Sequence, residues 1–389
     1  MPPELSISFT DVVHALLVLC AVASSGGFVA TGVGRARARR REAEFVRASA
    51  AHETPDVIPP LVSIIIAAHD EVQRIPALIA ALQAQTYPRE RMDIVVADDR
   101  STDGTAQVVA HLDPAVRIVR IDVTPAGVSP KKHALHTAIE AATAEFLLFT
   151  DADCRPGPDW VRAMVRRLAG GAEVVVGLSP VDGIRHGAQL LRGYESARAS
   201  MLMVAAIGWE APYMSLGRNW GYLRRSYEAV GGLPSLGHHL GGDDDLLLQR
   251  YVSAGAHIAS CTERDAACPT DPPAGWGALL RMRVRHLHVA AAYRGRGALL
   301  LAGFELAEFI TIFIAPAWFV VTTGMHPLLV AVVLVAKLSY DTRFLLPAMR
   351  GLPGRGGICT RLIMILLEPL HVASTVLFSV LAPLLRSRW

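Results

Sequence analysis

Long apolar stretches lie at both ends of the chain. Residues 12–33 contain no Asp, Glu, Lys or Arg and are long enough to cross the hydrocarbon core of a bilayer. A second apolar block, residues 298–385, divides into three segments at TGMHP and RGLPGRGG. The middle segment carries Lys337, Asp341 and Arg343, so it is the weakest of the four predicted membrane spans.

The basic run RARARRR, residues 35–41, directly follows the first apolar stretch. A secretory signal would carry its charge before a shorter apolar core, so this arrangement predicts an anchor whose C-terminal side is cytoplasmic. Alternation of the spans then returns the basic loop at 349–361 to the cytoplasm, as the positive-inside rule prefers. The run could instead be a nucleic-acid arm, but its place beside an apolar segment favours anionic lipid headgroups. We predict a multi-pass protein of the cell (inner) membrane with no nucleic-acid partner.

Between residues 60 and 292 short apolar runs alternate with helical periodicity. The helical patterns cover residues 74–85, 105–112 and 131–143. Continuous apolar runs of this kind are typical of strands buried on both faces of a parallel sheet, and they lie at 61–71, 93–99, 116–122 and 145–153. The alternation predicts an α/β fold with a mostly parallel sheet flanked by helices.

Three of the predicted strands end in carboxylates, namely Asp70 with Glu71, Asp98 with Asp99, and Asp151 with Asp153. The carboxyl ends of parallel strands share one edge, where such sheets bind ligands. Negative charges gathered there repel one another unless cations or hydrogen-bond donors lie between them. Mg²⁺ is held by one or two carboxylates together with substrate phosphates, so this edge is a candidate metal site. Alternatively, Asp151 and Asp153 are ordinary turn formers.

The chain contains only three lysines among its 38 basic residues. Two of them, Lys131 and Lys132, are adjacent and lie between the acidic strand ends in sequence. A compact ammonium group suits a phosphate, although a solvated helix start also accounts for exposed lysines. The five cysteines show no metal-ligand spacing, and the net charge of +3 indicates little about partners.

The motifs VSIIIAAHDE, VVADDRSTDGT, KKHAL and TDAD, in this order, resemble those of family 2 glycosyltransferases with the GT-A fold. The resemblance continues through GRNWGYLRRSYEAVGGLP, GGDDDLLLQRY and RMRVRHLH, and covers residues 61–288. It implies a GT-A domain at residues 60–292, preceded by an N-terminal anchor (1–34) and a basic juxtamembrane linker (35–59). A C-terminal membrane domain of about three helices (293–389) would follow.

The resemblance also implies roles at the donor site. Asp99, with Asp98 beside it, would accept hydrogen bonds from the base of a nucleotide-sugar, usually uracil, and Glu71 would lie on the same rim. Asp151 and Asp153 would hold Mg²⁺ or Mn²⁺ against the diphosphate, with Asp153 the direct ligand. Such a metal neutralises the leaving phosphate.

The acidic run GGDDD matches the motif that carries the general base. This match makes Asp243 the base that deprotonates the acceptor hydroxyl. Asp244 and Asp245 are alternatives, because the family usually has Glu where Gly242 stands. Asp is also favoured at a helix N-terminus for electrostatic reasons.

Two further motifs are expected near the acceptor. Asn219 and Trp220 would line its pocket by resemblance, or simply pack in the core. RMRVRHLH falls where processive synthases carry Q-x-x-R-W, with Arg285 at the arginine position and His286 in place of the tryptophan. Its alternating arginines suit either a diphosphate clamp or an interfacial helix.

These observations predict an inverting membrane glycosyltransferase that uses a nucleotide-sugar, with a UDP-sugar favoured. Anchors on both sides of the catalytic domain favour a lipid or lipid-linked acceptor at the cytoplasmic face. Two alternatives remain: a processive polysaccharide synthase, and a catalytically silent nucleotide-sugar-binding scaffold. The missing tryptophan weakens the first, and the retained Asp243 weakens the second because a binding module needs no base.

Overall fold

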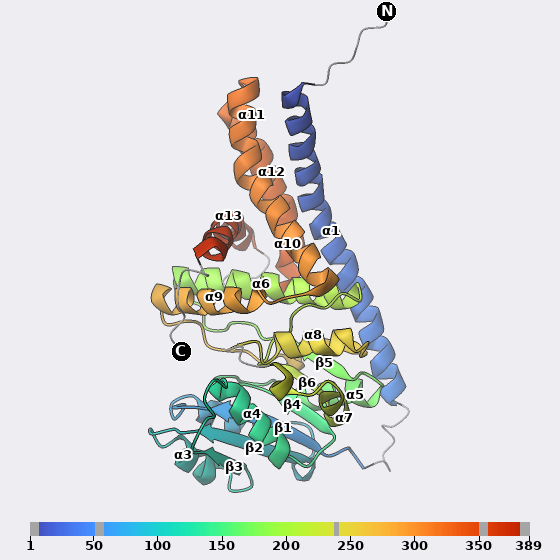
Figure 1. Cartoon of the computed structure of the whole chain (residues 1–389), viewed down its shortest axis with the longest axis vertical. Helices are drawn as coiled ribbons and strands as arrows, with labels where there is room; N and C mark the ends of the chain where they lie inside the picture. The colour runs from blue at the N-terminus through green and yellow to red at the C-terminus, as the bar shows by residue number, and fades with distance from the viewer. Residues whose placement is uncertain (1–7, 51–57, 237–240, 350–356, 382–389) are drawn as a thin grey trace, which may run out of the picture.

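The computed structural model describes residues 8–50, 58–236, 241–349 and 357–381. A seven-stranded mixed sheet with the order β3-β2-β1-β4-β6-β5-β7 forms the centre of the lower half of the molecule in Figure 1. The strands are β1 (Val62–Ala68), β2 (Met92–Asp99), β3 (Arg117–Ile121), β4 (Phe146–Phe149), β5 (Val174–Gly177), β6 (Trp220–Leu223) and β7 (Ile258–Cys261).

The four predicted strands correspond to β1 through β4, and they pair in parallel. Ile64 of β1 lies between Ile94 of β2 and Leu148 of β4, and all three side chains are almost completely buried. Burial on both faces explains why these strands appear as continuous apolar runs rather than alternating ones. The register also brings their carboxyl ends to one edge.

Three short strands complete the sheet, and the sequence pattern did not predict them. β5, β6 and β7 have four residues each, which is too short to show a period. β6 is antiparallel to both of its neighbours, β4 and β5, so the sheet is mixed rather than purely parallel.

Helices cover both faces of the sheet. On one face, α2 (Ile75–Gln83), α3 (Thr105–Leu112) and α5 (Trp160–Ala169) pack in one core. On the other face, the second core contains residues of α4 (Pro130–Ala141), α6 (Gly187–Gly208) and α8 (Asp245–Ser253). The short helix α7 (Arg224–Ala229) follows β6. The predicted layered α/β fold is therefore confirmed.

The N-terminal helix α1 (Phe9–Ala50) joins the apolar end of the molecule to the α/β domain. It continues through the basic run 35–41, which the sequence placed in a linker. α1 packs closely on α6, because a Cβ built on Gly208 would lie only 1.8 Å from the carbonyl oxygen of Gly34. Glycine permits this backbone approach, so the helix continues as a rigid part of the domain beyond its apolar stretch.

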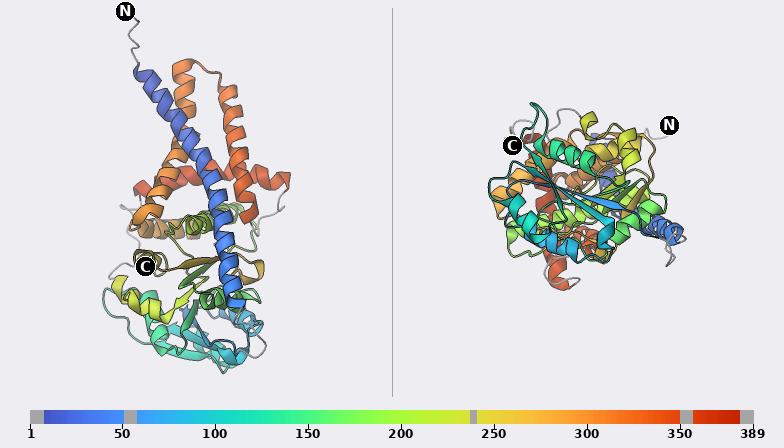
Figure 2. Two further views of the ribbon diagram at one scale, coloured as in Figure 1. Left: turned by 90° about the vertical axis from the view of Figure 1, so that its right-hand side faces the viewer. Right: turned by 90° about the horizontal axis from the view of Figure 1, so that it is seen from below.

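The other apolar helices stand beside α1 or lie across it. α10 (Gly295–Phe309), a π-helical turn and α11 (Ala315–Thr323) run continuously away from the domain, and α12 (Pro327–Leu345) returns. α6 and α9 (Trp276–Ala290) lie crosswise beneath them (Figure 1), and α13 (Ile358–Leu381) also lies crosswise (Figure 2). Within the described residues, three helices are long and apolar enough to cross a membrane: Phe9–Ser49, Gly295–Thr323 and Ile358–Ser379.

α12 does not meet the same criterion because of its charged side chains, two of which, Lys337 and Asp341, are paired inside the bundle. The ammonium of Lys337 lies 2.7 Å from Glu308 of α10 and 2.5 Å from Asp341. Both carboxylates are fully buried. Arg198 of α6 binds Glu305 and lies 3.9 Å from Glu308. We refer to Arg198, Glu305, Glu308, Lys337 and Asp341 as the inter-helix ion network.

Candidate active site

The carboxyl ends of β1 and β2 are joined by polar contacts between their loops. The amide of Thr102 donates to Asp70 at 2.8 Å, and the amide of Glu71 donates to the hydroxyl of Thr105 at 2.8 Å. Asp70 and Arg100 have φ angles of 52° and 57°, which side chains other than glycine rarely adopt. Strain of this kind is concentrated at functional sites. The two loops therefore form one preorganised rim.

Asp98 and Asp99 lie at this rim and are largely buried. Asp98 accepts a hydrogen bond from the amide of Ser101 at 3.3 Å and lies 3.8 Å from Arg120. Asp99 binds the guanidinium of its neighbour Arg100 at 2.8 Å. The predicted base-binding carboxylates are therefore held in place by local contacts at the edge of the sheet.

Asp151 and Asp153 follow β4 at the same edge. One oxygen of Asp153 accepts from the hydroxyl of Thr270 at 3.1 Å. Glu71 lies close by: burial raises its pKa, Arg74 opposes this change, and the charges of Asp153 and Asp151 raise it further. Hard carboxylate oxygens at the edge of the sheet, supplemented by substrate phosphates, are the ligand set that Mg²⁺ and Mn²⁺ take. The residues present fit such an ion.

Lys131 joins the end of β4 to the acidic run before α8. Its ammonium lies 3.0 Å from Asp151 and 3.4 Å from Asp243, two residues that are 92 positions apart in the sequence. Burial would lower the pKa of Lys131, but the charges of Asp151 and Asp243 outweigh it and raise the pKa. Conversely, burial would raise the pKa of Asp151, and Lys131 holds it below its ordinary value. This contact brings three predicted site residues together.

The three aspartates of the acidic run have different surroundings. Asp244 is the N-cap of α8 and accepts from the amides of Asp245 and Gly217 at 2.8 and 2.5 Å. Asp245 accepts from the amide of Ser215 at 2.8 Å and from the hydroxyl of Tyr293. Asp243 instead lies 3.4 Å from the ammonium of Lys131. The carboxylates of Asp244 and Asp245 therefore accept hydrogen bonds that shape the start of α8. This is the role expected of an aspartate at a helix N-terminus.

The pKa of Asp244 reflects its burial and its charged neighbours. Burial, followed by the negative charge of Asp243, raises the pKa of Asp244 to about 6. Lys132, which is almost fully buried, lies near the same carboxylates: burial lowers its pKa, and the charges of Asp243 and Asp244 oppose that change.

The arginines of RMRVRHLH separate onto different sides of α9. Arg283 is buried and binds Glu195 of α6 at 2.7 Å. Arg285 and His286 are exposed, and the charge of Arg285 helps to lower the pKa of Asp151. The two interpretations of this motif therefore apply to different residues, since Arg283 is packed between helices and Arg285 lies near Asp151.

Asn219 and Trp220 do not line a pocket in the structure. Asn219 is fully buried, and its side chain bonds Trp160 at 2.9 Å and the carbonyl oxygens of Leu178 and Ala266 at 2.8 and 3.0 Å. Trp220 is in β6 and packs against Phe149, with ring centroids 5.6 Å apart. These contacts favour the core-packing alternative for both side chains, and their role toward an acceptor stays a prediction.

The structure adds three residues that the sequence did not single out. Arg218 donates to the hydroxyl of Ser179 at 3.0 Å and lowers the pKa of Asp151 through its charge. Arg192 of α6 lies near Arg218, and burial followed by that like charge lowers its pKa to about 10. Thr270 orients Asp153. Arg218 stands within the quoted motif GRNWG, whereas nothing in the sequence marks the other two.

Residues 63–231 match the family described as glycosyl transferase family 2. This stretch of the chain is a family 2 glycosyltransferase domain. The glycosyltransferase AglE of Haloferax volcanii is 26% identical over 227 residues, which are 58% of this chain and 71% of that protein. The validoxylamine A glucosyltransferase of Streptomyces hygroscopicus subsp. jinggangensis is 30% identical over 120 residues, 30% of this chain and 28% of the relative.

The solved structures confirm the GT-A fold of the glycosyltransferase. A mannosyltransferase of Pyrobaculum calidifontis, solved in complex with GDP-Man and Mn²⁺, superposes with a TM-score of 0.59. The superposition covers 94% of this chain and 98% of that one at 22% identity. The similarity therefore extends over nearly the whole of both chains, including the helices outside the α/β domain.

Proposed function

We propose that this glycosyltransferase moves a sugar from a nucleotide-sugar, with inversion, to a lipid or lipid-linked acceptor at the cytoplasmic membrane face. The observation that carries the proposal is the position of Lys131, 3.0 Å from Asp151 and 3.4 Å from Asp243. Its ammonium thus contacts both Asp151, which would face the donor diphosphate, and Asp243, which would face the acceptor. A transferase needs both at one place, whereas a binding scaffold needs only the first.

On the donor side, Asp99 and Asp98 would accept hydrogen bonds from the nucleotide base, on the rim fixed by the loops after β1 and β2. UDP-sugars are the favoured donors by the family resemblance. The Pyrobaculum mannosyltransferase was solved with GDP-Man and Mn²⁺, so a GDP-sugar is the competing donor in any screen. Asp153 and Asp151 would hold Mg²⁺ or Mn²⁺, which when bound neutralises charge on the leaving diphosphate.

In the transfer step Asp243 would accept the proton of the acceptor hydroxyl as its oxygen bonds the anomeric carbon. The bond between that carbon and the diphosphate oxygen breaks at the same time, and the diphosphate carries away the bonding electrons. Attack opposite the leaving group inverts the anomeric configuration. Lys131 and Lys132, together with Arg285, would balance the charge that accumulates on the diphosphate.

The lipid acceptor is proposed from the position of the domain. α1 is packed on α6 at Gly34 and Gly208, and α10–α11 leaves the domain beside it, so the apolar helices extend from the same end of the α/β domain (Figure 1). The names of relatives do not decide the acceptor. They include validoxylamine A glucosyltransferase and, from Staphylococcus haemolyticus, a 4,4'-diaponeurosporenoate glycosyltransferase that is 30% identical over 24% of each chain.

The test uses native membranes that contain the full chain and radiolabelled UDP-glucose, UDP-galactose, UDP-N-acetylglucosamine and GDP-mannose. We expect one donor to label material that partitions into organic solvent and carries one or a few sugars. Membranes with Asp243→Asn provide the control and should label at background level. Label found only in a long water-soluble polymer would replace the proposal with the processive synthase.

A further inference from the structure

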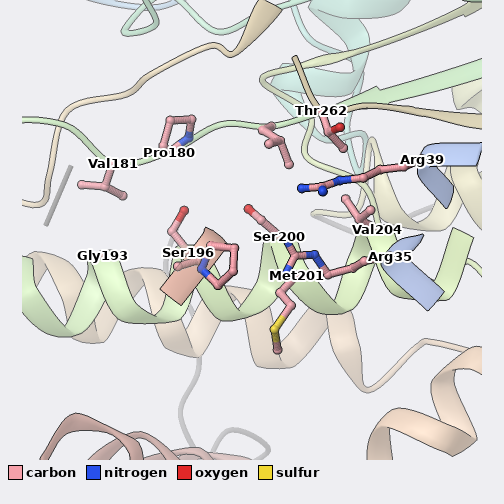
Figure 3. A pocket seen from close by; sticks show the side chains of 13 residues that line it. Arg35, Arg39, Pro180, Val181, Gly193, Ser196, Ser200, Met201, Val204 and Thr262 are labelled. Carbon is pink, nitrogen blue, oxygen red and sulfur yellow. The ribbon is translucent and has the colours of Figure 1, made fainter. Parts of the chain in front are cut away.

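A pocket lies between α1, α6 and the segment after β5 (Figure 3). Arg35 and Arg39 enter it from α1. Ser196 and Ser200 point into it from α6, and Pro180 and Val181 form the opposite wall. No residue proposed to bind the sugar nucleotide lines it.

The pocket carries unbalanced positive charge. Arg35 donates to the carbonyl oxygen of Phe344 at 3.2 Å, and Arg39 has no hydrogen bond or ion pair to the described residues. No carboxylate is among the lining residues. The nearest acid along α1, Glu42, is already bound by Arg167 and by the amide of Thr262. Two guanidinium groups facing one space repel each other unless an anion lies between them.

Ser200 is a second, independent indication of a ligand. Its side chain is 93% buried, since its exposed fraction is 7%, and within the described part of the chain its hydroxyl has no hydrogen-bond partner. Figure 3 shows it directed into the pocket. The hydroxyl therefore faces the pocket as a donor available to an occupant.

The size and position of the pocket limit that occupant. Its volume is ≈ 50 Å³, and one ordered water needs roughly 10–15 Å³ of such space. It therefore holds a group of about four water molecules' size, comparable with a phosphate and much smaller than a nucleotide-sugar. Pro347, just after α12, also lines it. The pocket thus lies where the apolar helices meet the α/β domain, at the expected depth of lipid headgroups.

The wall of the pocket is bonded to the metal-binding edge. Val181 forms a bridge with Thr270, and the amide of Thr270 donates to the carbonyl oxygen of Pro180 at 3.0 Å. The hydroxyl of Thr270 in turn donates to Asp153 at 3.1 Å. An occupant that contacts Pro180 and Val181 therefore stabilises the segment that orients Asp153.

We propose that this pocket binds the phosphate group of an anionic phospholipid headgroup through Arg35, Arg39 and Ser200. The bound phosphate group would contact residues 180–181 and so stabilise the segment that orients Asp153. The site is separate from the donor and acceptor sites, so it is tested by binding alone and does not depend on the proposed reaction.

The experiment counts lipids bound to the detergent-purified full chain by native mass spectrometry. Short-chain phosphatidylglycerol is titrated against phosphatidylcholine of the same chain length. Arg39→Gln should weaken the strongest phosphatidylglycerol binding about tenfold, the weight of one hydrogen bond to a charged group. Arg40→Gln removes the same charge one residue away, outside the pocket, and should leave that binding unchanged. Ser200→Ala removes the neutral donor and should weaken binding by a smaller factor.

A third arm of the experiment adds inorganic phosphate. It distinguishes a phosphate group that belongs to a lipid headgroup from free phosphate. Competition only at high concentration supports a lipid headgroup, whereas tight binding of phosphate alone supports the same pocket with free phosphate as its ligand. Equal losses in Arg39→Gln and Arg40→Gln, or equal binding of phosphatidylcholine, would overturn the proposal. If Arg39→Gln does not fold, unchanged binding in Ser200→Ala overturns it.

Discussion

Carboxylates gather in two regions of this glycosyltransferase, and their surroundings are opposite. At the catalytic edge Asp151, Asp153 and Asp243 stay partly exposed, and their protein contacts leave oxygens available. In the inter-helix ion network Glu308 and Asp341 are fully buried and bind the ammonium of Lys337. The first arrangement leaves room for a cation that arrives with substrate, whereas the second already contains its cation.

The difference shows that polar residues in apolar helices are not by themselves a catalytic signal. Glu308, Asp341 and Glu368 have oxygens within 4.8 Å of one another, which is close enough to suggest a metal. Lys337 binds two of these three carboxylates. We therefore assign the network to holding α6, α10 and α12 together, and the catalytic edge to chemistry.

Removal of divalent metal should have the largest effect on activity. Sugar transfer by purified membranes should fall to background in excess EDTA, because the leaving diphosphate then lacks its counter-charge. Mg²⁺ or Mn²⁺ in excess of the chelator should restore it. Full transfer in EDTA would show that Asp151 and Asp153 hold no catalytic ion.

Asp243→Asn should lower turnover by about 10²- to 10⁴-fold, the usual contribution of a general base, and leave donor affinity nearly unchanged. Asp244→Asn is the matched control, since its carboxylate accepts two backbone amides and should cost less activity. Turnover measured at saturating donor separates the two variants. If Asp244→Asn abolishes transfer and Asp243→Asn does not, the base is one residue later than assigned.

Arg198→Leu should destabilise the protein without directly touching the catalytic edge. It leaves the carboxylates of Glu305 and Glu308 without one of their cations, and breaking a buried ion pair typically costs about 3–5 kcal/mol. Thermal unfolding in detergent is the measurement. Arg225→Gln, which breaks an exposed pair with Glu145 at 3.6 Å, should change stability by less than about 1 kcal/mol. Equal shifts in the two variants would contradict the structural role of the network.

Asp99→Asn should produce the smallest of these effects. One hydrogen bond to a charged group contributes about 1.5–3 kcal/mol, so nucleotide affinity should fall by about 10- to 100-fold. Calorimetric titration with UDP measures it. Asp113→Asn, which alters a carboxylate directly after α3 that is paired with Arg89 at 3.1 Å, is the control and should bind UDP normally. Unchanged affinity in Asp99→Asn would remove Asp99 from the base-binding rim.

Much of the catalytic edge was predictable because β1, β2 and β4 are apolar runs that end in acids. The buried runs fix the strands, and parallel pairing carries Asp99 and Asp151 to one edge. The contact between Lys131 and Asp243 was not predictable, since it depends on how α4 and the loop before α8 fold over the sheet. Sequence spacing carries no information about such a long-range contact.

Asn219 and Trp220 show where the sequence left two alternatives open. Polar and aromatic side chains beside a motif resemble pocket residues in sequence. Asn219, however, bonds Trp160 and two backbone carbonyls in the core. β6, which carries Trp220, has only four residues and was not predicted as a strand. Without the strand, the sequence did not decide between an acceptor pocket and packing in the core.

Manganese binding tests the contrast between the two carboxylate groups most directly. Mn²⁺ bound to the detergent-purified full chain in the presence of UDP is measured by electron paramagnetic resonance in three proteins: wild type, Asp153→Asn and Glu368→Gln. Asp153→Asn should lose most of the bound Mn²⁺, and Glu368→Gln should bind it as the wild type does. Loss of Mn²⁺ in Glu368→Gln with retention in Asp153→Asn would place the metal among the apolar helices and contradict the assignment of both regions.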